Sequence, residues 1–311
     1  MVKRLTNRSL PQLLLIAGTL AFTLAILAFL LYRERELLRQ IQWRFEPWLI
    51  LGPFLTYLVG LGLVIFVWAD LMRHFGSTLP AAIHIEYFCV SQLAKRLPGT
   101  VWYIAGRSYL YKQVDEPLRR VTFASSVELL ITFLSGVLTS LLFAGYSLTE
   151  LTVLPWWGWL LLVALGLLLL HPRSLHYWAQ RFKINEVPPL HYGRLLLWVA
   201  LYALTWMIGG LILYFVGNLV IAIPMAQLPY LIGSWSLVGT LSFLVFFLPT
   251  NMGFSEVGLS LLLATLIPSA LAVVVAVLNR LFLLICELVG VASIVLCLRI
   301  QRRSKSKVYS S

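Results

Sequence analysis

Charge is what this sequence lacks most. Of its 311 residues only 12% are charged, whereas 60% are hydrophobic. A soluble domain of this length cannot hide so much apolar surface, and the apolar residues here form long runs rather than amphipathic stripes. The chain is therefore predicted to be an integral membrane protein.

Cysteines and catalytic motifs are also scarce. Three cysteines, Cys89, Cys286 and Cys297, lie in or beside apolar segments without the spacing of metal ligands. The sequence has no glycine-rich phosphate loop, no nucleophile elbow and no His-Glu metal motif. We therefore expect no metal, no cofactor and no enzymatic activity.

Apolar runs of about 20 residues, the length that crosses a bilayer, divide the chain into the spans of one membrane domain. The predicted spans are 11–31, 47–68, 120–144, 156–170, 194–218 and 271–298, followed by a cytoplasmic C-terminal tail, 299–311. Two further segments, 80–111 and 226–265, contain apolar pieces interrupted by polar residues and proline. Each is either a re-entrant hairpin or a pair of spanning helices, and periodicity does not decide between these.

The breaks in these two segments correspond. Pro98 and Gly99 interrupt the first, Pro249 and Gly253 interrupt the second, and the two prolines are 151 residues apart. The same 151-residue shift places the spans before and after the first break on the spans before and after the second break. Because each half has an odd number of simple spans, the second half must cross the bilayer upside down.

The sequence thus predicts an all-α, polytopic transmembrane bundle of two inverted-topology repeats, each with a broken or re-entrant helical segment. The repeats cover about 11–146 and 156–298. Paired breaks of this kind are typical of transporters that bind their substrate between the repeats.

The distribution of basic residues predicts the orientation. Most of the 24 Lys and Arg residues lie in 1–10, 69–120, 171–194 and 299–311, which the positive-inside rule places in the cytoplasm. Both termini are then cytoplasmic, and we expect a multi-pass protein of the plasma (cell inner) membrane. Basic cytoplasmic loops that contact anionic lipid headgroups account for the net charge of +12. We therefore expect no nucleic-acid partner.

Basic residues near the first break are candidates for binding, because a charge at bilayer depth costs about 3 kcal/mol on insertion scales. Lys95 and Arg96 precede Pro98, and Arg107 lies a few turns beyond it. Together they form a possible clamp for an anionic headgroup, since a guanidinium binds phosphate through two parallel hydrogen bonds. For all three the alternative is a role as anchors at the cytoplasmic interface. Trp102 either lines a lipid path or packs in the bundle.

Acidic residues within the spans are the other candidates. The 151-residue shift places Glu128 opposite Asn279, next to Arg280, and so predicts a buried Glu128–Arg280 ion pair between the repeats. This pair is either part of the substrate site or a static contact that fixes helix register. Glu287, two turns beyond Arg280, is an alternative partner. Glu256 follows the second break and either caps a helix or faces the cavity as a proton- or cation-coupling carboxylate.

The stretch 91–102, followed by Gly106 and Arg107, resembles the first signature of the lysylphosphatidylglycerol synthase transmembrane family, also called flippase-like. In that family a lysine-containing helix end leads into Pro-Gly, an aromatic residue and a Gly-Arg pair. The stretch 249–256 is similar to the second signature, Pro-Gly-Gly-Leu-Gly-Val-Arg-Glu. It keeps Pro249, Gly253 and Glu256 and departs at Thr250, Asn251 and Ser255.

The resemblance implies a membrane domain that moves a lipid, typically one with a charged or phosphorylated headgroup, between leaflets. We predict a flippase-like transporter of an anionic phospholipid or polyprenyl-phosphate-linked lipid. The alternative is a non-transporting accessory, or an intramembrane enzyme, of lipid or polyprenyl-glycan modification, with a lipid-modifying enzyme or glycosyltransferase as partner. In two-domain relatives an aminoacyl-transferring domain follows the last span, whereas only 301–311 follow here, so synthase activity is not expected.

Overall fold

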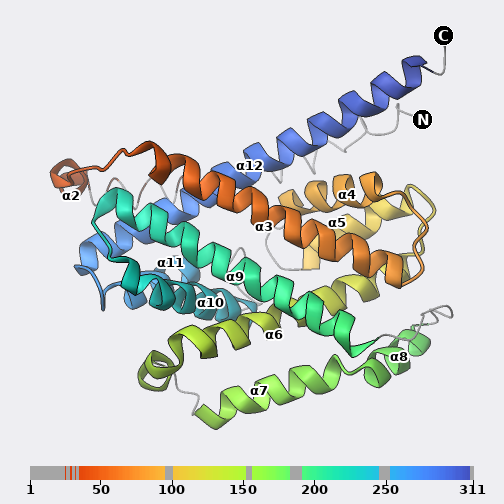
Figure 1. Cartoon of the computed structure of the whole chain (residues 1–311), viewed down its shortest axis with the longest axis horizontal. Helices are drawn as coiled ribbons and strands as arrows, with labels where there is room; N and C mark the ends of the chain where they lie inside the picture. Colours follow the sequence, from red (N-terminus) through yellow and green to blue (C-terminus); the bar gives the residue numbers. More distant parts are fainter. Residues whose placement is uncertain are drawn as a thin grey trace.

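The computed structural model describes residues 35–94, 101–151, 156–182, 191–244 and 253–308, together with residues 25, 29 and 32. Within these ranges the chain is helical and has no strand (Figure 1). The helices are α2 (Arg35–Gln40), α3 (Pro47–His74), α4 (Ala81–Ala94), α5 (Val101–Lys112), α6 (Leu118–Leu151), α7 (Trp156–Leu169), α8 (Pro172–Arg181), α9 (Tyr192–Val220), η2 (Met225–Gln227), α10 (Leu228–Leu244), α11 (Phe254–Leu263) and α12 (Ser269–Val308).

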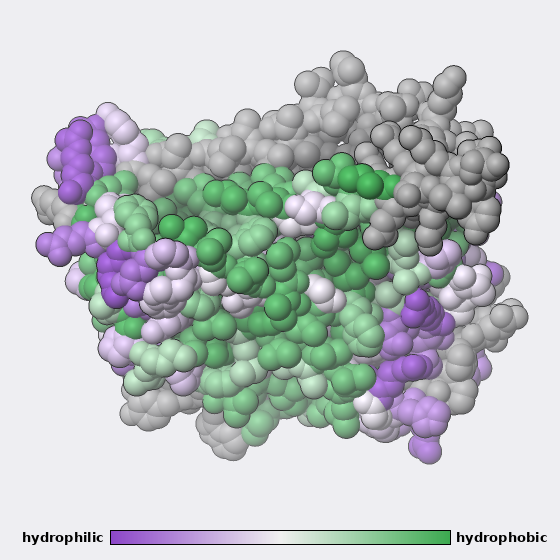
Figure 2. All heavy atoms as spheres, turned by 45° about the horizontal axis from the view of Figure 1, so that its top comes forward, coloured by the Kyte–Doolittle hydropathy of each residue, from purple (hydrophilic) through white to green (hydrophobic). Residues whose placement is uncertain are grey.

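Four of these helices are long and apolar enough to cross a membrane: α3, α6 as far as Phe143, α9, and α12 as far as Leu298. They contain the predicted spans 47–68, 120–144, 194–218 and 271–298. Figure 2 shows a broad apolar belt over the middle of one face, with hydrophilic residues gathered at its two ends. The chain therefore has the architecture of a multi-pass helical membrane protein. The predicted span 11–31 lies almost entirely outside the described residues.

Proline sets a bend of 58° between α7 and α8, which together make a fifth candidate span. The predicted span 156–170 coincides with α7. Pro172 is the first residue of α8, where a backbone N–H would have no acceptor within the helix, so its lack of an N–H costs nothing. His171 caps this start, because its Nδ1 accepts a hydrogen bond from the Arg173 N–H at 3.1 Å. His171 thus satisfies one of the N–H groups that the start of α8 leaves without an acceptor in its own helix.

The last helix runs further than the sequence predicts. α12 continues to Val308, so most of the predicted tail, 299–311, is helical. Figure 1 shows this end extending beyond the other helices. Basic side chains do not end a helix, because Lys and Arg have high helix propensity and favour the last turns.

Each interrupted segment consists of two short helices that pack together: α4 with α5, and α10 with α11. With 12 and 10 residues, α5 and α11 are about 18 and 15 Å long, less than the roughly 30 Å of a bilayer core. Pro98, Gly99 and Pro249 lie outside the described residues. Gly253 precedes α11 with φ +86°, a backbone conformation that only glycine adopts at little cost.

The long helices pack around the short ones. α3 packs along α9, α4 contacts α12, and α10 contacts both α6 and α9. Two apolar cores result, one around Trp68 and Trp198 and the other around Leu213 and Leu263.

Hydroxyl side chains on α6 bond to their own helix. Thr132, Ser135, Thr139 and Ser140 each donate to a backbone carbonyl three or four residues earlier, at 2.7–2.9 Å. Their donors are satisfied locally, as membrane helices require.

Glycine allows close contact between α9 and α10. A Cβ added to Gly210 would lie 2.4 Å from the Cα and 2.9 Å from the N of Ile232. Since these are backbone atoms, the two helices would have to separate. We expect Gly210→Ala to lower the free energy of unfolding by about 1–3 kcal/mol, the cost typical of overpacking.

Gly62→Ala is the matched control, because no atom lies within 4 Å of its added Cβ. It should leave stability unchanged or raise it by up to about 1 kcal/mol through helix propensity. Thermal unfolding of the purified variants in detergent measures both. Equal melting temperatures for the two would contradict the close approach of α9 and α10.

Candidate functional site

A cavity of about 510 Å³ lies between the helices, lined from α3, α4, α6, α9, α10, α11 and α12. The charged residues on its described wall are Glu128, Glu256, Arg280 and Glu287. Ionisable groups within membrane helices usually face such a cavity or one another. This polar space inside an apolar bundle is the candidate site.

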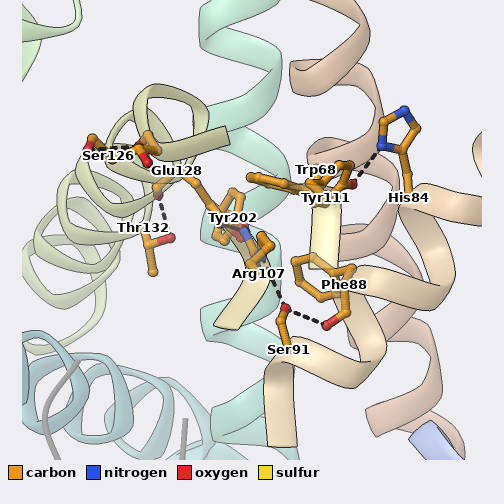
Figure 3. Close-up of polar contacts among 11 residues, drawn as sticks. Trp68, His84, Phe88, Ser91, Arg107, Tyr111, Ser126, Glu128, Thr132 and Tyr202 are labelled. Carbon is orange, nitrogen blue, oxygen red and sulfur yellow. Dashed lines mark hydrogen bonds and ion pairs between the residues drawn. The ribbon is translucent and has the colours of Figure 1, made fainter. Parts of the chain in front are cut away.

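Arg107 lies behind the cavity wall and is completely buried. Its Nη1 is 2.5 Å from Glu128 Oε2, and its Nε donates to Ser91 Oγ at 3.1 Å (Figure 3). The guanidinium also lies over the rings of Trp68 and Phe88, with 3.9 and 4.7 Å between its Cζ and the ring centroids. Cation–π contacts of this kind are strongest when they are desolvated. Arg107 is therefore paired and enclosed on several sides.

A second layer of hydrogen bonds orients this pair. Tyr202 Oη donates to Glu128 Oε1 at 2.8 Å. Tyr111 lies one turn after Arg107 on α5, and its Oη accepts a hydrogen bond from Trp68 Nε1 at 2.9 Å. The same hydroxyl is 2.7 Å from His84 Nδ1. These contacts hold the Trp68 ring in place over the guanidinium.

A second ion pair faces the cavity. Glu256 Oε1 is 3.4 Å from Arg280 Nε, and Glu256 Oε2 accepts a hydrogen bond from the Gly253 N–H at 2.9 Å. The Arg280 side chain is 26% exposed, and that of Glu256 is 8% exposed. The predicted cap of α11 is confirmed, because one oxygen of Glu256 accepts from the Gly253 N–H; the coupling role of this carboxylate stays a prediction. Ser255 bonds to Ser242, with 3.0 Å between the hydroxyl oxygens.

The predicted Glu128–Arg280 ion pair is wrong. Glu128 pairs with Arg107, and Arg280 pairs with Glu256. The reason is helix packing: α5 contacts α6 and α11 contacts α12, so each charge meets its partner on the neighbouring helix. The alternative of Glu287 as a partner of Arg280 stays a prediction.

The structure does not place four of the predicted binding residues at the cavity wall. Arg107 is buried against Glu128 and Ser91 and is not among the residues that line the cavity, so its contact with a headgroup stays a prediction. Lys95 and Arg96 lie outside the described residues. Trp102 belongs to α5, but its side chain is not described.

Sequence reasoning missed the residues that surround Arg107, although one signal was available. Arg107 and Tyr111 are four residues apart, and this spacing puts them on one helical face. The partners on α3, α4 and α9 have no such signal, because their contacts depend on tertiary packing. Among the side chains that the structure describes, no three His, Cys, Asp or Glu residues converge to hold a metal ion.

Removing one member of the buried pair should destabilise the protein strongly. We expect Glu128→Leu to lower the free energy of unfolding by about 3–5 kcal/mol, because Arg107 then stays buried without a counter-charge. The double variant Arg107→Met/Glu128→Leu should recover most of this loss, since neither charge remains. Unfolding in mixed micelles measures these differences.

Arg39→Met is the matched control, because Arg39 pairs with Glu36 at 3.5 Å where both side chains are mostly exposed. Such a pair contributes about 0–1 kcal/mol. A Glu128→Leu variant as stable as Arg39→Met would contradict the structural role of the buried pair.

Comparison with known proteins adds no assignment: no family model matches this chain, and no curated protein matches it.

Proposed function

We propose that this chain is a lipid carrier that moves an anionic phospholipid or a polyprenyl-phosphate-linked lipid between leaflets. The observation that supports this most is the cavity of about 510 Å³ with charged groups inside an apolar helical bundle. Its size lies within the roughly 300–1,000 Å³ typical of ligand sites. A headgroup would occupy this cavity while the acyl chains stay in lipid.

Arg280 is the one cationic residue that the structure describes on the cavity wall, beside the acidic Glu128, Glu256 and Glu287, and it is therefore the phosphate contact that we propose. Glu128 is neutralised from behind by Arg107, and Glu256 is neutralised by Arg280. Arg280 is partly exposed and lines the cavity, so its guanidinium can bind a phosphate oxygen with a modest change of side-chain position. Lys95 and Arg96 stay, with Arg280, the basic residues that we propose for headgroup binding.

The carrier would consist of two inverted repeats. Support comes from the element order, since α3 to α6 and α9 to α12 both run long helix, two short helices, long helix. The two ion pairs also correspond, because each joins the second short helix to the long helix that follows. The short helices α4 and α10 contact α12 and α6, the last helices of the opposite halves.

The mechanism we propose is alternating access, in which the two broken segments open in turn to the two sides of the membrane. It fits the resemblance to the lysylphosphatidylglycerol synthase transmembrane family, and it needs no catalytic group. In the proposed orientation both termini are cytoplasmic, in the plasma membrane, with the basic loops facing the anionic cytoplasmic leaflet.

Inverted repeats predict labelling from opposite sides. Thr78 and Ala226 are both exposed, just after the ends of α3 and α9. On a background without Cys89, Cys286 and Cys297, an impermeant maleimide should label Ala226→Cys in intact cells. Thr78→Cys should react only after permeabilisation. Labelling of both from one side would exclude inverted repeats.

The carrier function predicts lipid movement that depends on the exposed ion pair. In liposomes with fluorescent phosphatidylglycerol, the purified chain should move lipid between leaflets. Arg280→Gln and Glu256→Gln should each slow lipid movement at least about 10-fold. The first variant removes the charge-assisted contact with the headgroup, and the second removes the carboxylate that pairs with Arg280.

Arg39→Gln, which alters an exposed pair outside the cavity wall, should leave the rate unchanged. Melting temperatures separate loss of function from loss of folding. A wild-type rate no faster than that of protein-free vesicles would remove the support for a carrier.

A further inference from the structure

The short helix α8 leaves the direction of the apolar helix before it. It has 10 residues, a length of about 15 Å, and is bent by 58° from α7. Figure 1 shows it at the edge of the bundle, at the end where α9 begins, and the rings of His171 and Tyr192 are 5.1 Å apart there. With α7 along the membrane normal, α8 runs closer to the membrane plane than to the normal.

The side chains of α8 form two opposite faces. Leu175 and Ala179 are buried and belong to one of the two apolar cores, so they attach the helix to the bundle. Arg173, Tyr177 and Arg181 follow one another at intervals of four residues, and all three are exposed. This spacing puts them on one face of the helix, away from the buried one. We call these three residues the cationic ridge.

The two flanks of the cationic ridge differ in polarity, because a helix turns by about 100° at each residue. Trp178 lies on one flank, where it is 45% exposed and its ring is 5.5 Å from that of Tyr177. His176 and Gln180 lie on the other flank, exposed and 2.9 Å apart between their Nε2 atoms. The helix therefore presents an aromatic flank, a charged ridge and a polar flank in turn.

The surface next to α8 is one that lipid covers. On α7 four leucines are between 46 and 63% exposed: Leu160, Leu161, Leu165 and Leu168. A contiguous apolar surface of this kind marks contact with a membrane. α8 continues from the end of this surface, and the boundary between hydrocarbon and water is where tryptophan, tyrosine and basic residues are enriched.

The two arginines of the ridge are available to an anion. Neither Arg173 nor Arg181 forms an ion pair with any carboxylate in the part of the chain that the structure describes. Two helical turns separate them, about 12 Å along the axis, so they reach two different lipid molecules more readily than one phosphate. Guanidinium groups bind phosphate through paired hydrogen bonds.

We propose that α8 is an interfacial helix that binds anionic phospholipids of the leaflet at this end of the bundle. Arg173 and Arg181 contact lipid phosphates, and Tyr177 lies between them at the level of the headgroups. Trp178 reaches toward the acyl chains, whereas Gln180 faces water. None of these residues lines the cavity, so the inference goes beyond the carrier function and does not depend on it.

Fluorescent labels at two nearby positions test the depth of α8. On a background without the native cysteines, bimane is attached to Trp178→Cys or to Gln180→Cys of the full chain in phosphatidylcholine–phosphatidylglycerol vesicles. Brominated acyl chains quench a label that lies in lipid, and iodide quenches a label that lies in water. We expect brominated lipid to remove most of the fluorescence at position 178 and little at position 180, and iodide to do the reverse.

The label at position 178 also measures the preference for anionic lipid. Brominated phosphatidylglycerol should bind beside it at least about 5-fold more tightly than brominated phosphatidylcholine, the effect of one arginine at an anionic surface. Arg173→Gln/Arg181→Gln should abolish this preference, and Arg173→Lys/Arg181→Lys, which keeps both charges, should retain it. Arg280→Gln is the control for the cavity and should leave the preference unchanged.

Equal quenching by iodide at both positions would overturn the interfacial helix and leave the cationic ridge to a soluble partner. A preference that survives Arg173→Gln/Arg181→Gln would overturn the role of these two arginines. If that variant does not fold, the chain that keeps both arginines still decides, since equal binding of the two lipids beside its label would exclude an anionic partner. Lipid movement is measured on the same vesicles, so its loss would remove the carrier while the quenching at α8 stays as expected.

Discussion

Burying a guanidinium in an apolar bundle is the constraint on which the first half of this structure depends. Arg107 projects from α5 and is neutralised by Glu128 on α6, while Ser91 on α4 and Trp68 on α3 complete its surroundings. Tyr202 brings α9 into the same network. An unpaired charge in a medium of low dielectric constant is very costly. Moving any of these five helices would remove a contact of the buried Arg107–Glu128 pair, and this cost opposes the movement.

The two ion pairs occupy comparable places but differ in exposure. Arg107 and Glu128 are sealed between helices, whereas Arg280 is partly exposed to the cavity and sits at a longer distance from Glu256. The first arrangement fixes helix register. The second leaves its charged groups able to exchange partners with a bound molecule, which is why the carrier proposal depends on it.

The long helices could be predicted from the sequence because their signal is local. Hydropathy alone places α3, α6, α9 and α12, and the prolines in the sequence between them predict that each intervening segment is divided. The partners of an ion pair cannot be read from local sequence. Glu128 and Arg280 are both isolated charges in apolar runs, and the packing of α5 on α6 determines that Glu128 pairs with Arg107. The continuation of α12 past residue 298 was missed because a positively charged helix end resembles a loop in hydropathy.

The hydroxyls of α6 have a consequence for motion. Thr132, Thr139 and Ser140 donate to carbonyls of their own helix and not to the neighbouring α10. These three hydroxyls therefore add no directional bond across to α10. A shift of α10 along α6 would leave all three hydrogen bonds in place, because the donor and the acceptor of each belong to the same helix.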